Sequence, residues 1–178
     1  MELKKEKILA GVGRILGMFG HFGILGIILE LIGVYKISEA VKDKRIFNYL
    51  LLSEVVIYII YFVGFLGIFG SFFRTIMEPD MYIMSNMPNL FLMLVIYIAA
   101  MIIPVIYKIK VYNLMGDYFG NDNFYKASKF LLWGLILSIV LVGFILTFVA
   151  NIFAIIGYFT LPDEYPENII SENDNENY

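Results

Sequence analysis

Four long apolar stretches fill most of this chain and constrain its fold more than any other feature. A helix of about 20 apolar residues crosses the hydrocarbon core of a bilayer, so each stretch is long enough to span it. A soluble domain of this size has too little core to bury four such stretches. The sequence therefore predicts an all-α, polytopic protein of the cell membrane, with a bundle of four transmembrane helices. The predicted spans are residues 8–35, 49–73, 90–107 and 130–159.

Composition supports one membrane domain followed by a short tail. Hydrophobic residues make up 60% of the chain and charged residues 16%, whereas soluble domains are about 45–50% apolar. No linker leads to a second core, so residues 1–161 are predicted to form a single integral membrane domain. Residues 162–178 carry six acidic residues and no Lys or Arg. Such a segment cannot bury enough apolar surface to offset its ordering entropy, so we expect a disordered tail outside the membrane.

Residue usage excludes several kinds of chemistry. The chain has no cysteine and one histidine, His21, which excludes disulfides, thiolate catalysis and metal sites built from Cys or several His residues. No phosphate-binding glycine motif occurs, and the glycines from Gly11 onward follow no predicted strand. We therefore expect no enzyme activity, no cofactor and no metal site, and nothing indicates nucleic acid as a partner.

The distribution of Lys and Arg predicts an orientation. Charged loops over residues 36–48 and 108–129 hold eight Lys and Arg residues, against five on the opposite side of a four-span bundle. Positive charge favours the cytoplasm, which predicts cytoplasmic loops with both termini on the opposite side, although the basic N-terminus argues the other way. We also expect residues 34–47 to form an amphipathic helix at the interface, with basic residues that contact anionic headgroups. These residues are Lys36, Lys42, Lys44 and Arg45.

A short internal repeat relates the two charged loops. Val34-Tyr35-Lys36-Ile37 is matched by Val111-Tyr112-Asn113-Leu114, and Phe47 and Phe124 follow at the same offset. Each match follows an odd-numbered span and precedes an even-numbered one, as in parallel repeats of two helix hairpins. The alternative is that both loops meet the same interfacial demand for aromatic and charged residues.

The first and last spans are longer than a bilayer requires. We expect them to bend at glycines, of which Gly17, Gly20, Gly23 and Gly143 are the best placed, or to run along the interface before crossing. A full hairpin is disfavoured, since each half would hold only about 13–15 residues, too few to cross the core.

Ionisable residues inside the spans are candidate functional groups because charge is costly in hydrocarbon. Arg14 and His21 are two helical turns apart and share a helix face, which could line a polar crevice. Alternatively, the Arg14 side chain snorkels outward, and His21 donates a hydrogen bond to a carbonyl of a neighbouring helix. Glu30 and Glu54 lie at similar depth near one membrane face, where they could bind a cation or relay a proton. The alternative pairs both carboxylates with the cations of the first charged loop.

Several apolar segments resemble a mainly archaeal integral-membrane family catalogued as domain of unknown function 996. The resemblance covers the chain from about Lys7 to Pro162, and it implies a membrane fold and location but no activity, cofactor or site. The acidic tail, Arg14 and His21 fall outside the family pattern. The matching segments are Gly11-Val-Gly13, the run from Gly26 to Ser38, Ile46-Phe47-Asn48-Tyr49-Leu50, Val142-Gly143-Phe144 and Ile156-Gly157-Tyr158-Phe159.

Few polar residues line the spans, which favours a non-enzymatic structural, accessory or partner-binding subunit. The alternative is a small transporter or channel component that uses Arg14, His21, Glu30 and Glu54; a membrane enzyme is third. Glycines at small-xxx-small spacing, such as Gly13 and Gly17, allow helices to approach closely within one chain, in a homo-oligomer or against a membrane partner. Convergence of the four ionisable residues on a water-filled crevice would favour transport, and contact with headgroups or loop lysines would favour the structural role.

Overall fold

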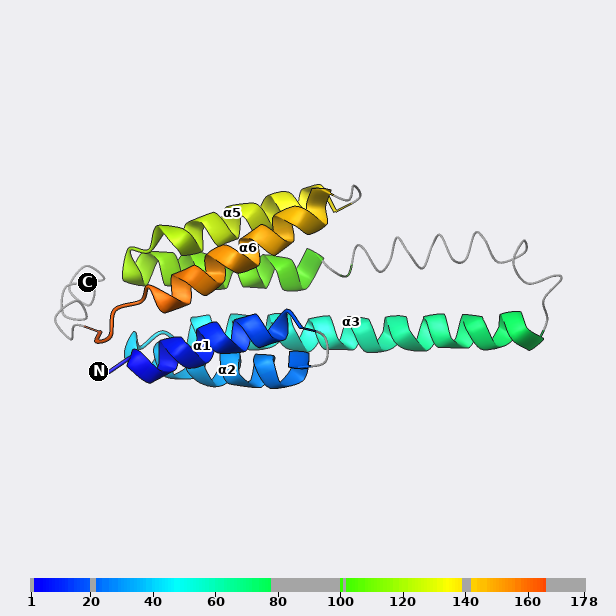
Figure 1. Cartoon of the computed structure of the whole chain (residues 1–178), viewed down its shortest axis with the longest axis horizontal. Helices are drawn as coiled ribbons and strands as arrows, with labels where there is room; N and C mark the ends of the chain where they lie inside the picture. The colour runs from blue at the N-terminus through cyan, green and yellow to red at the C-terminus, as the bar shows by residue number, and fades with distance from the viewer. Residues whose placement is uncertain (1, 20–21, 78–99, 101, 139–141, 166–178) are drawn as a thin grey trace, which may run out of the picture.

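The computed structural model describes residues 2–19, 22–77, 100, 102–138 and 142–165, and in this part of the chain the regular structure is helical (Figure 1). The all-α prediction is therefore confirmed. An isolated bridge between Glu2 and Glu164 joins the two ends of the described chain. The helices are α1 (Lys4–Gly17), α2 (Gly23–Ala40), α3 (Lys44–Met77), a helix over residues 102–119, α5 (Asp122–Ile136) and α6 (Val142–Phe159).

The first predicted span is an antiparallel hairpin of α1 and α2. Glycines bring the two backbones into direct contact: a Cβ atom on Gly13 would lie 2.3 Å from the backbone nitrogen of Glu30, and one on Gly26 would lie 2.2 Å from that of Gly17. The prediction of one bent helix over residues 8–35 is wrong. That prediction assumed that the glycines bend a single helix, whereas they form the contact surface between two helices.

The last predicted span is also a hairpin, formed by α5 and α6. A Cβ atom on Gly134 would lie 2.6 Å from the Thr147 Oγ1 atom, and one on Gly143 would lie 2.5 Å from the Leu137 carbonyl carbon. One helix over residues 130–159 is therefore wrong. Most of the predicted span 90–107 lies outside the described residues. In the described part, two helices are long and apolar enough to cross a membrane, Lys44–Gly67 and Val142–Phe159.

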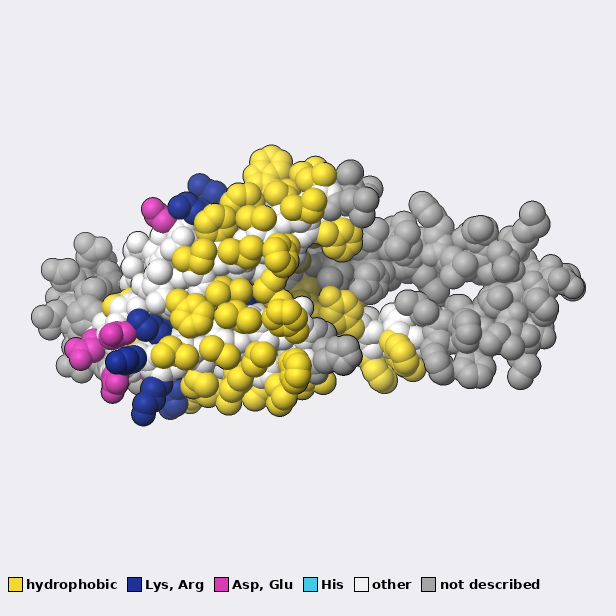
Figure 2. Space-filling view, in the orientation of Figure 1, with side chains coloured by type: hydrophobic (Ala, Val, Ile, Leu, Met, Phe, Trp, Pro, Cys, Tyr) yellow, Lys and Arg dark blue, Asp and Glu magenta, His cyan; other side chains and the backbone are white. Residues whose placement is uncertain are grey.

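The two ends of the described chain, at Glu2 and Tyr165, and the turns at residues 41–43 and 120–121 lie at one end of the bundle, which we call the charged end (Figure 1). The Leu3 amide donates to the Asp163 carbonyl at 2.6 Å, and Lys7 pairs with the Asp163 carboxylate at 2.6 Å. The Tyr118 hydroxyl donates to Asp43 at 2.9 Å, which joins the two turns. For the described ends of the chain, the prediction of a position opposite the charged loops is therefore wrong, because each hairpin adds one reversal of the chain. Figure 2 shows Lys, Arg, Asp and Glu gathered at this end, with hydrophobic side chains over the rest of the described face.

The charged loops are much shorter than predicted. Residues 34–47 are not one amphipathic helix, because α2 ends at Ala40, Lys42 adopts a φ of 57° in the turn, and α3 begins at Lys44. Their apolar residues pack inward, since Val34 and Ile46 are buried. The loop predicted over residues 108–129 reduces to a turn at residues 120–121.

The beginning of the acidic tail is packed rather than disordered. Tyr165 is buried, and its ring meets that of Phe119 edge-on at 5.5 Å. Residues 166–178 lie outside the described part of the chain.

The segments matched in the internal repeat occupy matched positions. Tyr35 lies near the end of α2 and contacts Phe47 in the first turn of α3, with ring centroids 5.1 Å apart. Tyr112 lies in the second half of the helix over 102–119 and contacts Phe124 in the first turn of α5, with ring centroids 6.1 Å apart. In the second pair both rings are fully buried, and Phe124 also meets Tyr158 of α6 at 5.3 Å. This aromatic group fills the core beneath the charged end.

Candidate functional site

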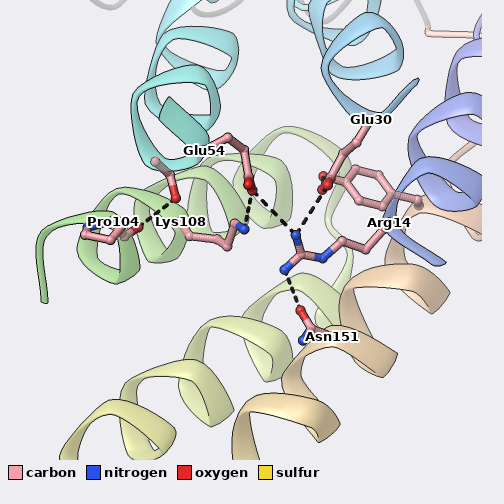
Figure 3. Close-up of polar contacts among 8 residues, drawn as sticks. Arg14, Glu30, Glu54, Pro104, Lys108 and Asn151 are labelled. Atoms are coloured by element: carbon pink, nitrogen blue, oxygen red, sulfur yellow. Dashed lines mark hydrogen bonds and ion pairs between the residues drawn. The ribbon is translucent and has the colours of Figure 1, made fainter. Parts of the chain in front are cut away.

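Polar and charged side chains from five helices meet in the interior of the bundle, and we call this group the ionic network (Figure 3). Three members lie at the same depth. Arg14, Glu30 and Glu54 are each ten residues from the charged end of their own helix, which corresponds to about 15 Å. The depth is shared because α1 and α3 enter from the charged end while α2 returns to it. The members of the network are Arg14 of α1, Glu30 of α2, Glu54 of α3, Lys108 of the helix over 102–119, and Asn151 of α6.

Arg14 lies at the centre and contacts three other helices. Its Nη1 atom is 3.3 Å from the Glu30 Oε2 atom and 3.7 Å from the Glu54 Oε1 atom, and its Nη2 atom donates to the Asn151 Oδ1 atom. Lys108 donates to the same Glu54 oxygen. Two cations therefore face two carboxylates, and the formal charge of the group is zero.

Three of the four charged members of the network are buried, and the Arg14 side chain is 11% exposed. The exposed fraction is 1% for Glu30, 4% for Glu54 and 6% for Lys108. The Tyr158 hydroxyl donates to the second oxygen of Glu30 at 3.1 Å. Ionised groups at such burial are retained only when opposite charges and hydrogen bonds replace their hydration, which this arrangement supplies. The network is thus a largely buried group whose charges are balanced within the bundle.

Two buried polar atoms beside the network have no hydrogen-bond partner in the described structure: the Arg14 Nε atom and the Tyr112 hydroxyl. Tyr112 is fully buried and interacts electrostatically with Arg14, Glu30 and Glu54. Buried donors without acceptors are uncommon in native proteins, and each requires an explanation such as a water molecule or a bound ligand.

Of the four ionisable candidates from the sequence, the structure brings three together. Arg14 contacts both Glu30 and Glu54, and His21 lies outside the described residues. The expectation that cations of the first charged loop hold the two carboxylates is wrong, because their cationic partners are Arg14 and Lys108. The sequence placed Lys108 in a loop, so it could not be proposed as a partner from inside the bundle.

The four predicted headgroup-binding residues are all exposed at the charged end. Lys36 pairs with Glu39 at 2.7 Å, and Arg45 pairs with Asp43 at 2.7 Å. Lys42 and Lys44 are exposed on and beside the turn. Hydrogen bonds from the Arg45 side chain hold the pKa of Asp43 below its usual value, with a further contribution from Tyr118. This pair orders the turn and leaves the remaining cations facing outward.

Sequence reasoning missed Lys108, Tyr112 and Tyr158 as neighbours of the carboxylates. A signal existed for Lys108: it precedes Tyr112 by four residues and therefore shares its helix face, whereas Lys110 lies on another. The structure shows the consequence. Lys108 is buried, while Lys110 is exposed and lies over the rings of Tyr49 and Tyr107.

Comparisons with known proteins place the chain in a family. The model of a family described as protein of unknown function (DUF996) matches residues 22–152. An uncharacterized protein of Methanocaldococcus jannaschii is 31% identical over 170 residues, which cover 92% of this chain and 96% of that protein. No solved structure matches. The family prediction from the sequence is confirmed, and the matched range contains Glu30, Glu54, Lys108 and Asn151.

Proposed function

We propose a non-enzymatic, structural or accessory role in the membrane for this chain, which belongs to the DUF996 family of proteins of unknown function. Large apolar side chains on its helices support a membrane location: Phe62 is 63% exposed and Phe144 is 70% exposed. A soluble protein does not leave such extensive apolar surface in water. The clustering of Lys and Arg at the charged end supports an orientation with that end in the cytoplasm.

The observation that carries the structural role is the internal balance of the ionic network. Each carboxylate meets a cation from another helix: Glu30 meets Arg14, and Glu54 meets Lys108 and Arg14. Removing one member of a buried pair leaves an uncompensated charge, whereas replacing the whole pair with apolar residues is often neutral. Such a network fixes how helices dock. We propose that it holds both hairpins in one arrangement on α3.

Lipids and membrane proteins are the proposed partners. The exposed basic side chains at the charged end suit anionic headgroups, and the exposed apolar helix faces suit acyl chains, a second copy of the chain or another membrane protein. These cations are Lys36, Lys42, Lys44 and Arg45.

Reconstitution into liposomes tests the structural role. We expect purified protein to show no proton or cation flux, and Glu30→Gln to lower thermal stability without any other effect. Conversely, flux that Glu30→Gln abolishes while the protein stays folded would overturn the structural role. Asp122→Asn is a suitable control, because Asp122 is exposed at the start of α5 and removed from the network.

A second candidate, a small transporter component, is favoured by one specific observation. Arg14, Glu30 and Glu54 converge, and two buried donors beside them have no acceptor. Sites for protons and ions in transporters lie at this kind of repeat interface inside the membrane. The variant Tyr112→Phe separates the two candidates, because it removes a buried hydroxyl that has no hydrogen-bond partner. If the network is purely structural, the variant protein should be as stable as the wild type or more stable. If the network is a transport site, the variant should lose flux.

A further inference from the structure

The acidic tail begins as a segment packed against the charged end. Asp163 pairs with Lys7 at 2.6 Å, and the Lys7 Nζ atom also donates to the Leu161 carbonyl at 2.7 Å. Leu161 and Tyr165 are buried, although both follow the last residue of α6. Charge and burial therefore hold the first residues of the tail in place, and Tyr165 is the position from which the remaining residues extend.

Tyr165 lies close to the turn between α2 and α3. Its ring contacts that of Phe119 edge-on, with centroids 5.5 Å apart. The neighbouring residue, Tyr118, donates to Asp43 in that turn at 2.9 Å. An exposed lysine lies on either side of Asp43 in the sequence. The point at which the tail leaves the bundle is therefore near two exposed ammonium groups.

Four exposed lysines at the charged end form no ion pair with any described residue. The ion pairs at this end use Lys7, Lys36 and Arg45, and the others in the described structure lie in the ionic network. Two of the four lie in the first turn of α1, and two lie on or beside the turn before α3. Like charges gathered in this way favour an anionic partner. We call them the unpaired lysines: Lys4, Lys5, Lys42 and Lys44.

The backbone of Lys42 indicates a use for its side chain. Its φ of 57° lies in the left-handed region, where glycine is the least strained residue. Strained residues persist where the surrounding structure or the function requires them. The Lys42 side chain is exposed, so packing does not require it, and glycine at this position would relieve the strain. We therefore attribute the lysine to contact with an anionic group.

The remainder of the tail has the complementary charge and sufficient reach. Residues 166–178 contain four acidic residues and no Lys or Arg. Fully extended, they span up to about 43 Å, and their attachment at Tyr165 keeps them at an effective concentration of about 1 mM or more at the charged end. The acidic residues are Glu167, Glu172, Asp174 and Glu176.

We propose that residues 166–178 bind back to the unpaired lysines and thereby compete with anionic lipid headgroups for them. Four carboxylates then neutralise four ammonium groups, so the charged end attracts an anionic membrane less strongly. The contact between Asp163 and Lys7 shows the same mode of binding in the described part of the tail. The competition rests on the lipid partner in the proposed function, whereas the binding of the tail does not.

Zero-length cross-linking of the full chain tests the binding of the tail. A carbodiimide joins carboxylates to amines in direct contact, and mass spectrometry identifies the joined residues. At low ionic strength we expect cross-links from the acidic residues of the tail to the unpaired lysines. These should disappear at about 1 M salt, where the Debye length is about 3 Å. Absence of such cross-links at low salt would overturn the proposal. So would cross-links that, in a mixture of isotope-labelled and unlabelled chains, form only between copies.

Titration of the detergent-solubilised protein with phosphatidylglycerol tests the competition. We expect a chain that ends at Tyr165, and a full chain with the four tail carboxylates changed to amides, to bind this lipid about two- to fivefold more tightly than the wild type. The control Asn168→Ser with Asn175→Ser retains all four acidic residues and should match the wild type. Equal affinity of all four proteins would overturn the competition. If none binds the lipid, the proposed lipid partner is wrong, while the cross-links still decide whether the tail binds.

A variant of the lysines and a matched control complete the test. Lys42→Gly with Lys44→Gln removes two of the four charges, and glycine suits the φ of 57° at the first position, so we expect this variant to fold. The gain in lipid affinity on removal of residues 166–178 should become smaller in this background. Lys110→Gln is the control, because Lys110 is exposed and lies over the rings of Tyr49 and Tyr107; it should keep the full gain. An undiminished gain in the double variant would overturn the proposal.

Discussion

Replacement of Lys108 by methionine tests whether the ionic network is desolvated. The substitution keeps the length of the side chain and removes its charge. Glu54 then loses its closest cation and retains the Arg14 Nη1 atom at 3.7 Å. Breaking a buried ion pair by removing one partner costs about 3–5 kcal/mol. Since Arg14 remains, we expect a value near the lower limit, about 3 kcal/mol.

The double variant Glu54→Leu with Lys108→Met isolates the interaction between the two groups. Each single variant leaves one charge in a buried site, but the double variant leaves neither, and Arg14 keeps its pairing with Glu30. An apolar pair in place of a buried ion pair is often neutral or stabilising. We therefore expect the double variant to be more stable than either single variant, with a coupling energy of about 3 kcal/mol.

Thermal unfolding in detergent micelles, followed by size-exclusion chromatography after heating, measures these differences. For a chain of this length, about 3 kcal/mol corresponds to a decrease of about 6–12 °C in Tm. Exposed ion pairs contribute about 0–1 kcal/mol. A decrease of less than about 2 °C in both single variants would therefore mean that water reaches the pair. In that event the interior position of the network, and the reasoning built on it, would be refuted.

Three further predictions concern the hairpin, the turn and the charged end. Gly26→Ala should destabilise the protein by about 1–3 kcal/mol, which is the usual cost of overpacking a close contact. The new Cβ atom would lie 2.2 Å from the Gly17 nitrogen. As the control, Gly70→Ala should leave Tm unchanged. The pKa of Asp43 is lowered in the folded state. The pairing of Asp43 with Arg45 therefore stabilises the protein fully at pH values above the ordinary aspartate pKa of about 3.9. This stabilisation is lost as the pH falls through the lower pKa of the folded state. Melting curves across this acidic range should therefore show a smaller loss for Asp43→Asn than for the wild type; an equal loss would contradict the assignment. Cysteines introduced singly at Glu39 and Glu164 should react with an impermeant maleimide from the same side, and reaction from opposite faces would exclude a shared charged end.

The helical class was predictable because it depends on the amount of apolar residue and not on its detailed order. The two helical hairpins could not be predicted in this way. Residues 8–35 form a continuous apolar run whether the chain bends or reverses, and only the contact between Gly13 and α2 shows that it reverses. Short helices of this kind depend on tertiary packing, to which hydropathy along the chain is insensitive.

The candidate site was predictable in part for a related reason. Arg14, Glu30 and Glu54 are conspicuous as charges within apolar runs. Lys108 is not conspicuous, because it directly follows an apolar run, and lysines are common at that position, where a span meets the membrane interface. Its partner Glu54 is 54 residues away in the chain, and a single sequence carries no record of such a pairing.

The separations in sequence within the ionic network set an order in which its charges are neutralised as the chain emerges from the ribosome. Glu30 follows Arg14 by 16 residues, so the first hairpin can enter the bilayer with its arginine already compensated. Glu54 arrives next and leaves one excess negative charge, which persists until Lys108 is made. Asn151, 137 residues after Arg14, completes the contacts of the guanidinium last. In the membrane location proposed above, biogenesis would include an interval in which α3 has an uncompensated carboxylate, and a nascent chain stalled in that interval is the species we expect the cell's insertion machinery to retain longest.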